Sequence, residues 1–283
     1  MTQRTTLITG ATQGMGRALA LDLASRGGTV LLHGRNRDRL EAVAAEARAT
    51  AHDVTVRTYL ADLADLDQVR AMADEIRAAE THLSGLINNA VAGGGSDPFT
   101  RELSRQGHEL RFAVNHLAPY ALTRGLLPLL TASAPARVIN VASIGQEAVD
   151  FDDVMLERDY EGLRAYCRSK LALITATFEL AAELDGSGVT VNTLHPAHLM
   201  DTEGVRAYGL TPVIGTDEGV RPTVRLLLDP ELATTTGRYF DRFTDTRAHD
   251  QAYDAEARER LMELTHRLLG HSQQLRGATR TDA

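Results

Sequence analysis

A tyrosine and the only lysine of the chain stand four residues apart, at Tyr166 and Lys170. On a helix this spacing places both side chains on one face, where the ammonium can approach the phenol. A free tyrosine ionises at about pH 10, and a neighbouring cation lowers that pKa because it stabilises the phenolate. The pair could therefore act as a general acid or base. The rest of the 30 basic residues are arginine, so the lysine at this position indicates a function.

Ser143 is a second candidate for chemistry, because it follows the apolar run 137–142, which predicts a buried strand. In open α/β sheets, ligands bind at the carboxyl ends of the strands. At that edge the hydroxyl could hydrogen-bond a substrate oxygen on which charge develops. Taken alone, Ser143 could equally be the serine of a turn or of a helix cap.

Three glycines, Gly10, Gly14 and Gly16, follow the first predicted strand and precede a helical run. Glycines at such a turn let backbone N–H groups approach a pyrophosphate, and the helix N-terminus attracts its charge. The spacing differs from G-x-G-x-x-G, and no Gly-Lys-Ser/Thr of a Walker A loop follows. The turn predicts dinucleotide binding, and an ordinary strand–helix corner is the alternative.

The end of the second predicted strand indicates which dinucleotide would bind. It carries no acidic residue to accept hydrogen bonds from the ribose 2′-hydroxyl of NAD. Arg35 offers instead a planar, charged fork suited to a 2′-phosphate. This favours NADP(H) over NAD(H). The alternative is that Arg35 and Arg37 only begin a solvated helix face.

These residues are carried by strands and helices that alternate along the first two-thirds of the chain. The strands are continuous apolar runs, which are typical of strands buried on both faces. The pattern predicts a single-domain Rossmann fold of the α/β class over residues 1–270, with a doubly wound parallel sheet of about seven strands and helices on both faces. A substrate lid is expected at 196–216 and a flexible tail at 271–283. The predicted strands are 5–9, 29–33, 54–59, 83–88, 137–142, 189–194 and 238–240, and the helices include 17–26, 37–49, 66–79, 107–130 and 163–184.

Composition excludes several classes of protein. The net charge is −8 with no basic stripe, which argues against nucleic acid as a partner. No apolar run is long enough to insert into a membrane, and a strand-like run close to the N-terminus leaves no room for a signal peptide, so we expect a cytoplasmic protein. Cys167 is the only cysteine and is expected to be buried and inert. His195 and His198 lack nearby carboxylates, so no metal site is predicted.

Together these residues resemble the classical short-chain dehydrogenase/reductase (SDR) family over nearly the whole chain. The resemblance implies an oxidoreductase that interconverts a carbonyl and an alcohol. In it Tyr166 would be the acid or base, Lys170 would lower its pKa and hold the nicotinamide ribose, and Ser143 would orient the carbonyl. Asn115 would anchor a water in the proton relay. The motifs that carry the resemblance, in the family's order, are 9–16, Asp62, Asn88-Asn89-Ala90, Asn115, Ser143, Tyr166, Lys170 and Pro196.

The resemblance also implies the contacts of the cofactor. Asp62 would contact the adenine, and Asn89 would lie beside the adenosine ribose. The complete set of expected cofactor-binding residues is Gly10, Thr12, Gln13, Gly14, Met15, Gly16, Arg35, Asn36, Asp62, Leu63, Asn89, Ala90, Tyr166, Lys170, Pro196 and Thr202.

Within the family, the chain is most similar to the retinol-dehydrogenase-like and WW-domain-oxidoreductase-like members. The similarity rests on 33–36, on the long interval between Ser143 and Tyr166, and on 237–240. Val91 and Ala197 replace family glycines, and the Asp201-Thr202 pair moves an expected threonine by one position. We expect these departures to change cofactor affinity and to leave the proton and hydride chemistry intact.

The substrate pocket is expected at 93–95, 144–160 and 199–214, which mix apolar residues with carboxylates. This composition indicates a small-molecule carbonyl or alcohol of medium size and partly lipophilic character, and NADP(H) would favour reduction. One alternative is a catalytically idle NAD(P)-binding sensor, and another is an epimerase or dehydratase. The helices 107–130 and 163–184 resemble the family's dimer-forming pair, so a homodimer or homotetramer is predicted.

Overall fold

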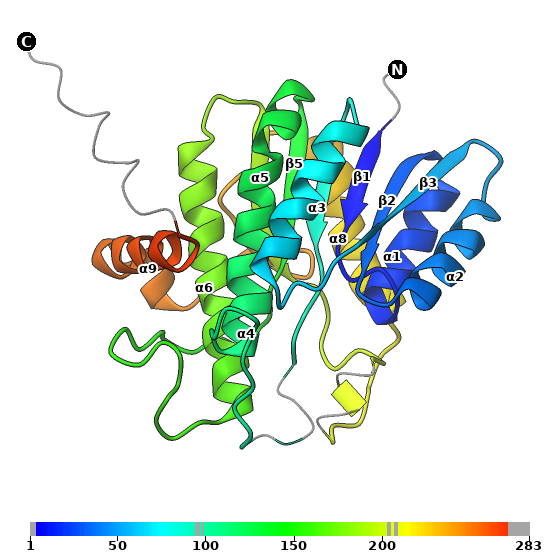
Figure 1. Cartoon of the computed structure of the whole chain (residues 1–283). Helices are drawn as coiled ribbons and strands as arrows, with labels where there is room; N and C mark the ends of the chain where they lie inside the picture. The colour runs from blue at the N-terminus through cyan, green and yellow to red at the C-terminus, as the bar shows by residue number, and fades with distance from the viewer. Residues whose placement is uncertain (1–3, 94–96, 98, 203–204, 207–208, 271–283) are drawn as a thin grey trace, which may run out of the picture.

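Within residues 4–93, 97, 99–202, 205–206 and 209–270, which the computed structural model describes, eight strands form one sheet (Figure 1). The strand order is β3-β2-β1-β4-β5-β6-β7-β8, and every neighbouring pair but the last is parallel. The predicted α/β Rossmann fold is confirmed. The strands are β1 (Thr5–Ile8), β2 (Gly28–Gly34), β3 (Val54–Leu60), β4 (Gly85–Asn88), β5 (Ala136–Val141), β6 (Val189–His195), β7 (Tyr239–Asp241) and β8 (Thr244–Thr246).

The eighth strand was not predicted from the sequence. It is three residues long and fully exposed, and it pairs antiparallel with β7 across a tight turn at Arg242 and Phe243. Arg242 adopts a positive φ of 54° there. The polar sequence Thr-Asp-Thr has no apolar pattern to indicate a strand, and only its pairing with β7 creates one.

Helices cover both faces of the sheet, as Figure 1 shows. Successive strand residues point to opposite faces, so Leu7 packs in one hydrophobic cluster and Ile8 in the other. Both residues are apolar because both faces are covered. One face carries α1 (Gly14–Ser25), α2 (Arg37–Arg48) and α8 (Asp217–Leu228), and the other carries α3 (Leu66–Ala79), α5 (Ala118–Ala132) and α6 (Gly162–Glu183).

The predicted helix 107–130 is three elements in the structure. A short helix, α4 (Leu110–Phe112), leads into a π-helical turn, η1 (Ala113–Leu117), before α5 begins. Single π turns inside helices are frequent at functional sites. Here the turn places Asn115 against the end of β4, which a continuous α-helical period does not predict.

A C-terminal helix, α9 (Ala255–Leu268), crosses the helical face formed by α5 and α6 (Figure 1). Leu261 and Thr265 are buried at this contact. Two 3-10 turns, η2 (Pro230–Leu232) and η3 (Asp250–Tyr253), lie in the connections before it. The predicted tail, 271–283, lies outside the described residues.

None of the described helices has both the length and the apolar character that a membrane span requires.

Candidate active site

The glycine turn lies between β1 and α1, at the carboxyl edge of the sheet. Gly10 has a φ of 67°, and a Cβ atom there would lie 2.8 Å from the Ala90 Cα. A Cβ atom at Gly16 would collide with the carbonyl oxygen of Gly10. Both positions therefore require glycine, and the backbone is drawn close to the end of β4.

The first turn of α1 has the features of an anion site. Its N-cap residue, Gln13, makes no capping hydrogen bond with its side chain, and the turn contains no acidic residue. Its backbone N–H groups and the positive end of the helix dipole are thus available to a phosphate. These residues fit the pyrophosphate of a dinucleotide.

Hydrogen bonds hold the glycine turn against β4. The Thr9 hydroxyl accepts from the backbone N–H groups of Asn89 (3.0 Å) and Ala90 (3.1 Å). In return, the Asn89 Nδ2 donates to the carbonyl oxygens of Thr9 (2.9 Å) and Gly10 (3.2 Å). The structure thus brings Asn89 and Ala90 to the cofactor side, where the sequence predicts them.

His33, which the sequence analysis did not single out, also holds this turn. Its Nδ1 accepts from the Gly10 N–H (3.2 Å), and its Nε2 lies 3.1 Å from the Ala61 carbonyl oxygen. Burial lowers the pKa of His33 to about 4, so the ring is neutral and its Nε2–H donates to Ala61. The only feature of the sequence that could have pointed to this role is the position of His33 at the end of a predicted strand.

The predicted 2′-phosphate residues follow β2. Arg35 is exposed, and the neighbouring glycine, Gly34, lies directly against Thr12. The Asn36 side chain accepts from the Arg39 N–H (2.9 Å) and caps α2. Asn36 therefore has a structural role at this position in addition to the predicted cofactor contact.

Two other predicted cofactor residues follow β3. The Asp62 carboxylate accepts from the Ala64 N–H (2.9 Å) and remains partly exposed, while Leu63 is buried. The segment that carries Asp62 and Leu63 lies beside the end of β2, because β2 and β3 pair from their first to their last residues.

The loop after β6 reaches the glycine turn. A Cβ atom at Gly14 would lie 3.2 Å from the Thr202 Cγ2, so Thr202 contacts the turn despite its shifted position. Pro196, Met200 and the Met15 side chain meet at Gly219 of α8. The described part of the predicted lid folds back on itself, with Asp201 and Val213 donating to Ile214 and Leu199. Residues 203–204 and 207–208 of this segment lie outside the described residues.

Tyr166 and Lys170 lie on one face of α6, as the spacing predicts. The Lys170 Nζ lies 5.7 Å from the centroid of the Tyr166 ring. It donates to the Val141 carbonyl oxygen (2.7 Å) at the end of β5. Burial lowers the pKa of Lys170 to about 7.

The pKa of Tyr166 differs from the prediction in this structure. Burial raises it above the usual value, and a hydrogen bond with the Ser143 side chain only partly opposes this effect. The predicted lowering by Lys170 is therefore not met in the protein alone, where burial of the phenol is the largest influence on its pKa and burial also lowers the pKa of Lys170 itself. The phenol stays protonated at neutral pH.

Ser143 is held by contacts on both its side chain and its backbone. Its hydroxyl accepts from the Gly145 N–H (3.0 Å). Its carbonyl oxygen accepts from the hydroxyl of Tyr239 (3.0 Å) and from the Gln146 Nε2 (3.1 Å). Tyr239 comes from β7, so a strand near the edge of the sheet fixes a residue that follows the more central strand β5, which sequence patterns do not reveal.

Asn115 connects the π turn to the end of β4 and to α6. Its Oδ1 accepts from the Ala92 N–H (2.8 Å), and its Nδ2 donates to the Ala92 carbonyl (2.9 Å) and to the Ser169 hydroxyl (2.9 Å). Ser169 in turn donates to the Tyr166 carbonyl (2.7 Å). Asn115 is thus linked through Ser169 to the helix that carries Tyr166 and Lys170, and Tyr166 in turn hydrogen-bonds Ser143. We refer to Ser143, Tyr166, Lys170 and Asn115 as the cluster at the carboxyl edge.

The remaining histidine and cysteine candidates do not add a site. The rings of His195 and His198 lie 6.4 Å apart, and no group of three metal-ligating side chains occurs in the described part of the chain. Cys167 is half-buried, less than expected, and its partial burial raises the thiol pKa to about 11.

A set of exposed apolar side chains, which we call the apolar rim, lies in the segments that follow β4, β5 and β6. Ser143 follows β5, and Ala92, the partner of Asn115, follows β4. Of the predicted pocket segments, residues 94–95, 203–204 and 207–208 lie outside the described residues. The rim residues and their exposed fractions are Val91 (55%), Phe99 (75%), Ile144 (56%), Leu210 (44%) and Val213 (62%).

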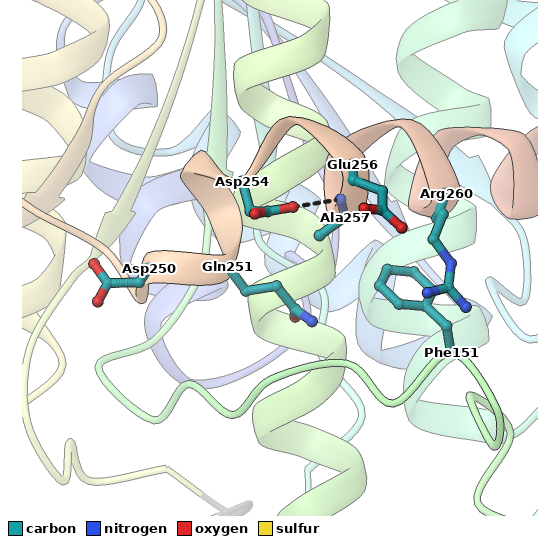
Figure 2. A pocket seen from close by; sticks show the side chains of 7 residues that line it. All are labelled: Phe151, Asp250, Gln251, Asp254, Glu256, Ala257 and Arg260. Carbon is teal, nitrogen blue, oxygen red and sulfur yellow. Dashed lines mark hydrogen bonds between the residues drawn. The ribbon is translucent and has the colours of Figure 1, made fainter.

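Two cavities lie elsewhere, along α9. One, of about 460 Å³, is lined by Phe151, Arg260 and residues of 250–257 (Figure 2). Arg260 stacks over the Phe151 ring at 4.6 Å, and Asp254 caps α9. Neither cavity includes Ser143, Tyr166, Lys170 or Asn115.

Comparison with known proteins identifies the family of the chain. A family model described as short chain dehydrogenase matches residues 4–210. Retinol dehydrogenase 13 of Homo sapiens is 37% identical, and the match covers 94% of this chain and 85% of the relative. Retinol dehydrogenase 12 of Homo sapiens is 36% identical over 93% of this chain and 85% of its own length.

Solved structures of similar fold include an uncharacterized protein and a short chain dehydrogenase. An uncharacterized protein from Mycobacterium paratuberculosis has a TM-score of 0.76 and 30% identity, covering 95% of this chain and 94% of that chain. A short chain dehydrogenase from Escherichia coli CFT073 complexed with NADPH has a TM-score of 0.69 and 26% identity, with coverages of 85% and 97%. The chain belongs to the short chain dehydrogenase family of oxidoreductases. The retinol-dehydrogenase-like character predicted from its motifs is confirmed.

Proposed function

We propose that this protein is an NADP(H)-dependent oxidoreductase that interconverts a carbonyl and an alcohol, with Tyr166 as the general acid or base. The observation that carries the proposal is the convergence of Ser143, Tyr166 and Lys170 at the carboxyl edge. NADP(H), when bound along the glycine turn, supplies or accepts the hydride.

In the direction of reduction, the Tyr166 phenol donates its proton to the substrate oxygen. Ser143 donates a hydrogen bond to the same oxygen as charge develops on it. Lys170 stabilises the phenolate that remains. The raised pKa of Tyr166 keeps the phenol protonated before the reaction, which suits an acid. In oxidation the phenolate takes the proton of the alcohol.

The preference for NADP(H) rests on Arg35. It stands exposed at the end of β2, where no acidic side chain is present to bind a ribose 2′-hydroxyl. Family members solved with NADPH or NADP agree with this preference. NADP(H) favours the direction of reduction.

The substrate is proposed to be a lipophilic aldehyde, ketone or alcohol. The apolar rim supports this class, since such side chains lose water contact when they cover an apolar substrate. The relatives are named retinol dehydrogenases, which makes all-trans-retinal, the aldehyde of retinol, the first substrate to test.

Calorimetric titration with NADPH and with NADH tests the cofactor assignment. We expect tighter binding of NADPH, and we expect Arg35→Ser to weaken NADPH about tenfold or more without changing NADH binding, because it removes a charge-assisted contact to the phosphate. Arg37→Ser, on the same exposed segment, is the matched control. Binding of neither nucleotide would overturn the proposal.

Turnover separates an enzyme from an idle NAD(P)-binding protein. Wild-type protein with NADPH should reduce all-trans-retinal, as followed by the loss of NADPH absorbance. A protein that binds NADPH tightly and reduces no carbonyl compound would fit the idle alternative.

A further inference from the structure

A buried ion pair lies beside the active site and plays no part in the chemistry described above. The side chains of Glu109 and Arg111 are each only 1% exposed, and the Glu109 Oε1 lies 3.5 Å from the Arg111 Nη1. Buried charges are costly unless every partner is supplied. The cost of burying Glu109 and Arg111 therefore calls for an explanation in terms of what the pair holds in place.

Every nitrogen of the Arg111 guanidinium reaches a different acceptor. Its Nε donates to the Gly93 carbonyl oxygen (2.9 Å), and its Nη2 donates to the Glu102 carboxylate (2.9 Å). Gly93 directly follows Ala92, which Asn115 holds by two hydrogen bonds. Arg111 and Asn115 thus fix consecutive residues of the segment after β4.

Glu109 attaches a second segment to the same pair. Its Oε1 accepts from the Tyr160 hydroxyl (3.1 Å), and its Oε2 accepts from the Phe112 N–H (2.8 Å). The Tyr160 ring also lies under the guanidinium, with its centroid 5.9 Å from the Arg111 Cζ. Burial and the Glu109 charge raise the pKa of Tyr160, so its hydroxyl remains a proton donor.

Two contacts of Met155 strengthen this attachment. The Met155 Sδ lies 3.4 Å from the Glu109 N–H, and the Met155 carbonyl oxygen accepts from the Arg101 Nε (2.8 Å). One ion pair therefore ties together the segment after β4 and residues 155–160. These are two of the three segments that the sequence predicts around the substrate, and neither belongs to the glycine turn.

We propose that Glu109 and Arg111 are positioning residues that hold the substrate-side wall of the active site, and that Tyr160 is the contact through which they fix its longer segment. The inference rests on the proposed function, because it assigns these residues to substrate binding by the same site. A three-way fork of this kind needs arginine, since a lysine ammonium cannot present three planar donors to separate acceptors.

Tyr160→Phe is the sharpest test, because it removes one hydroxyl and leaves the ion pair and the aromatic ring in place. With NADPH and all-trans-retinal, we expect KM to rise about threefold to tenfold, with kcat within about twofold and NADPH affinity unchanged. Tyr120→Phe, which removes a hydroxyl bonded to His266, is the matched control and should leave KM unchanged.

Hydrogen exchange on the NADPH-bound protein gives a second measurement that does not require turnover. In Tyr160→Phe, the amides of 148–160 should exchange faster, whereas those of 9–16 should not change. Failure of the wild type to reduce all-trans-retinal would count against the proposed function, and the exchange result would still decide this inference. An unchanged exchange rate at 148–160, or a KM equal to the wild type, would overturn it.

Arg111→Lys is a harsher variant that leaves Glu109 and Glu102 poorly paired. If it folds, its KM should rise more than that of Tyr160→Phe, because it loosens both segments. A KM closer to the wild type than that of Tyr160→Phe would contradict the proposal that Arg111 holds both segments of the wall.

Discussion

At the scale of single residues, the proposed reaction depends on the Tyr166 phenol, whose proton would be transferred, and on the neighbours that hold it. Tyr166 lies between the Ser143 hydroxyl and the Lys170 ammonium, and Tyr239 and Gln146 fix Ser143 from behind. Tyr239 and Gln146 hold Ser143 by its carbonyl oxygen, so they position the residue without occupying its hydroxyl.

Tyr166→Phe keeps the ring and removes the transferable proton. We expect kcat for carbonyl reduction to fall about 10²-fold or more, the usual contribution of a positioned acid, while NADPH affinity stays within about twofold. Steady-state turnover and calorimetry measure the two effects. Tyr253→Phe, which removes a hydroxyl that accepts from the Ala248 N–H and is not one of the proposed catalytic residues, serves as control. Substantial activity in Tyr166→Phe would exclude Tyr166 as the acid.

Buried neutral histidines predict an acid-sensitive fold. Burial lowers the pKa of His33 to about 4, of His116 to about 3 and of His195 to about 4. Between about pH 6.5 and those values, the unfolded chain binds more protons than the folded chain, so stability falls as the pH falls. Each histidine contributes at most about 1.4 kcal/mol per pH unit.

Urea unfolding at a series of pH values between 7.5 and 4.5 checks this expectation. The free energy of unfolding should fall less steeply below pH 6.5 in His33→Gln than in the wild type. His52→Gln, at an exposed position, should match the wild-type slope. Equal slopes in all three proteins would show that His33 titrates normally in the fold.

At the scale of elements, α9 supports the π turn that carries Asn115. The His116 Nε2 lies 2.7 Å from the Thr265 hydroxyl, and both residues are fully buried. The His116 Nδ1 has no partner among the described residues. Thr265 is thus the side chain on which this buried ring depends for a hydrogen bond.

Thr265→Val keeps the shape of the side chain and removes the hydroxyl. We expect a loss of about 1–3 kcal/mol in the free energy of unfolding, because a buried polar ring is left without a partner. Thr265→Ser should retain most of the stability. Chemical denaturation of both variants provides the measurement, and a Val variant as stable as the wild type would disprove the dependence on α9.

At the scale of the whole molecule, self-association and a cytoplasmic location stay predictions from the sequence. α9 packs across both helices of the expected dimer-forming pair, through the Arg258–Glu179 ion pair and the Tyr120–His266 contact. α9 therefore covers part of the surface on which a dimer built on α5 and α6 would form.

Light scattering tests the assembly directly. The chain has a mass of 30.7 kDa, and we expect twice or four times that value in solution. A mass of 30.7 kDa would mean that α9 shields the pairing surface. Cell fractionation with a tagged chain checks the location. A membrane-bound pool would contradict the predicted cytoplasmic location.

The sequence by itself determined the features that depend on local pattern. Apolar runs predicted the parallel strands, including β7, because strands buried on both faces must be apolar throughout. The spacing of Tyr166 and Lys170 predicted a shared helix face, and the glycine spacing predicted a phosphate turn. These features need only neighbouring residues, so periodicity and residue type reveal them.

Tertiary structure alone decided the contacts between distant segments. Tyr239 reaches Ser143 across 96 positions of sequence, and His116 meets Thr265 across 149. The Glu109–Arg111 pair joins two separate loops, and burial rather than Lys170 sets the direction of the Tyr166 pKa in the protein alone. Burial and long-range hydrogen bonds arise only once the chain has packed, so no local pattern encodes them.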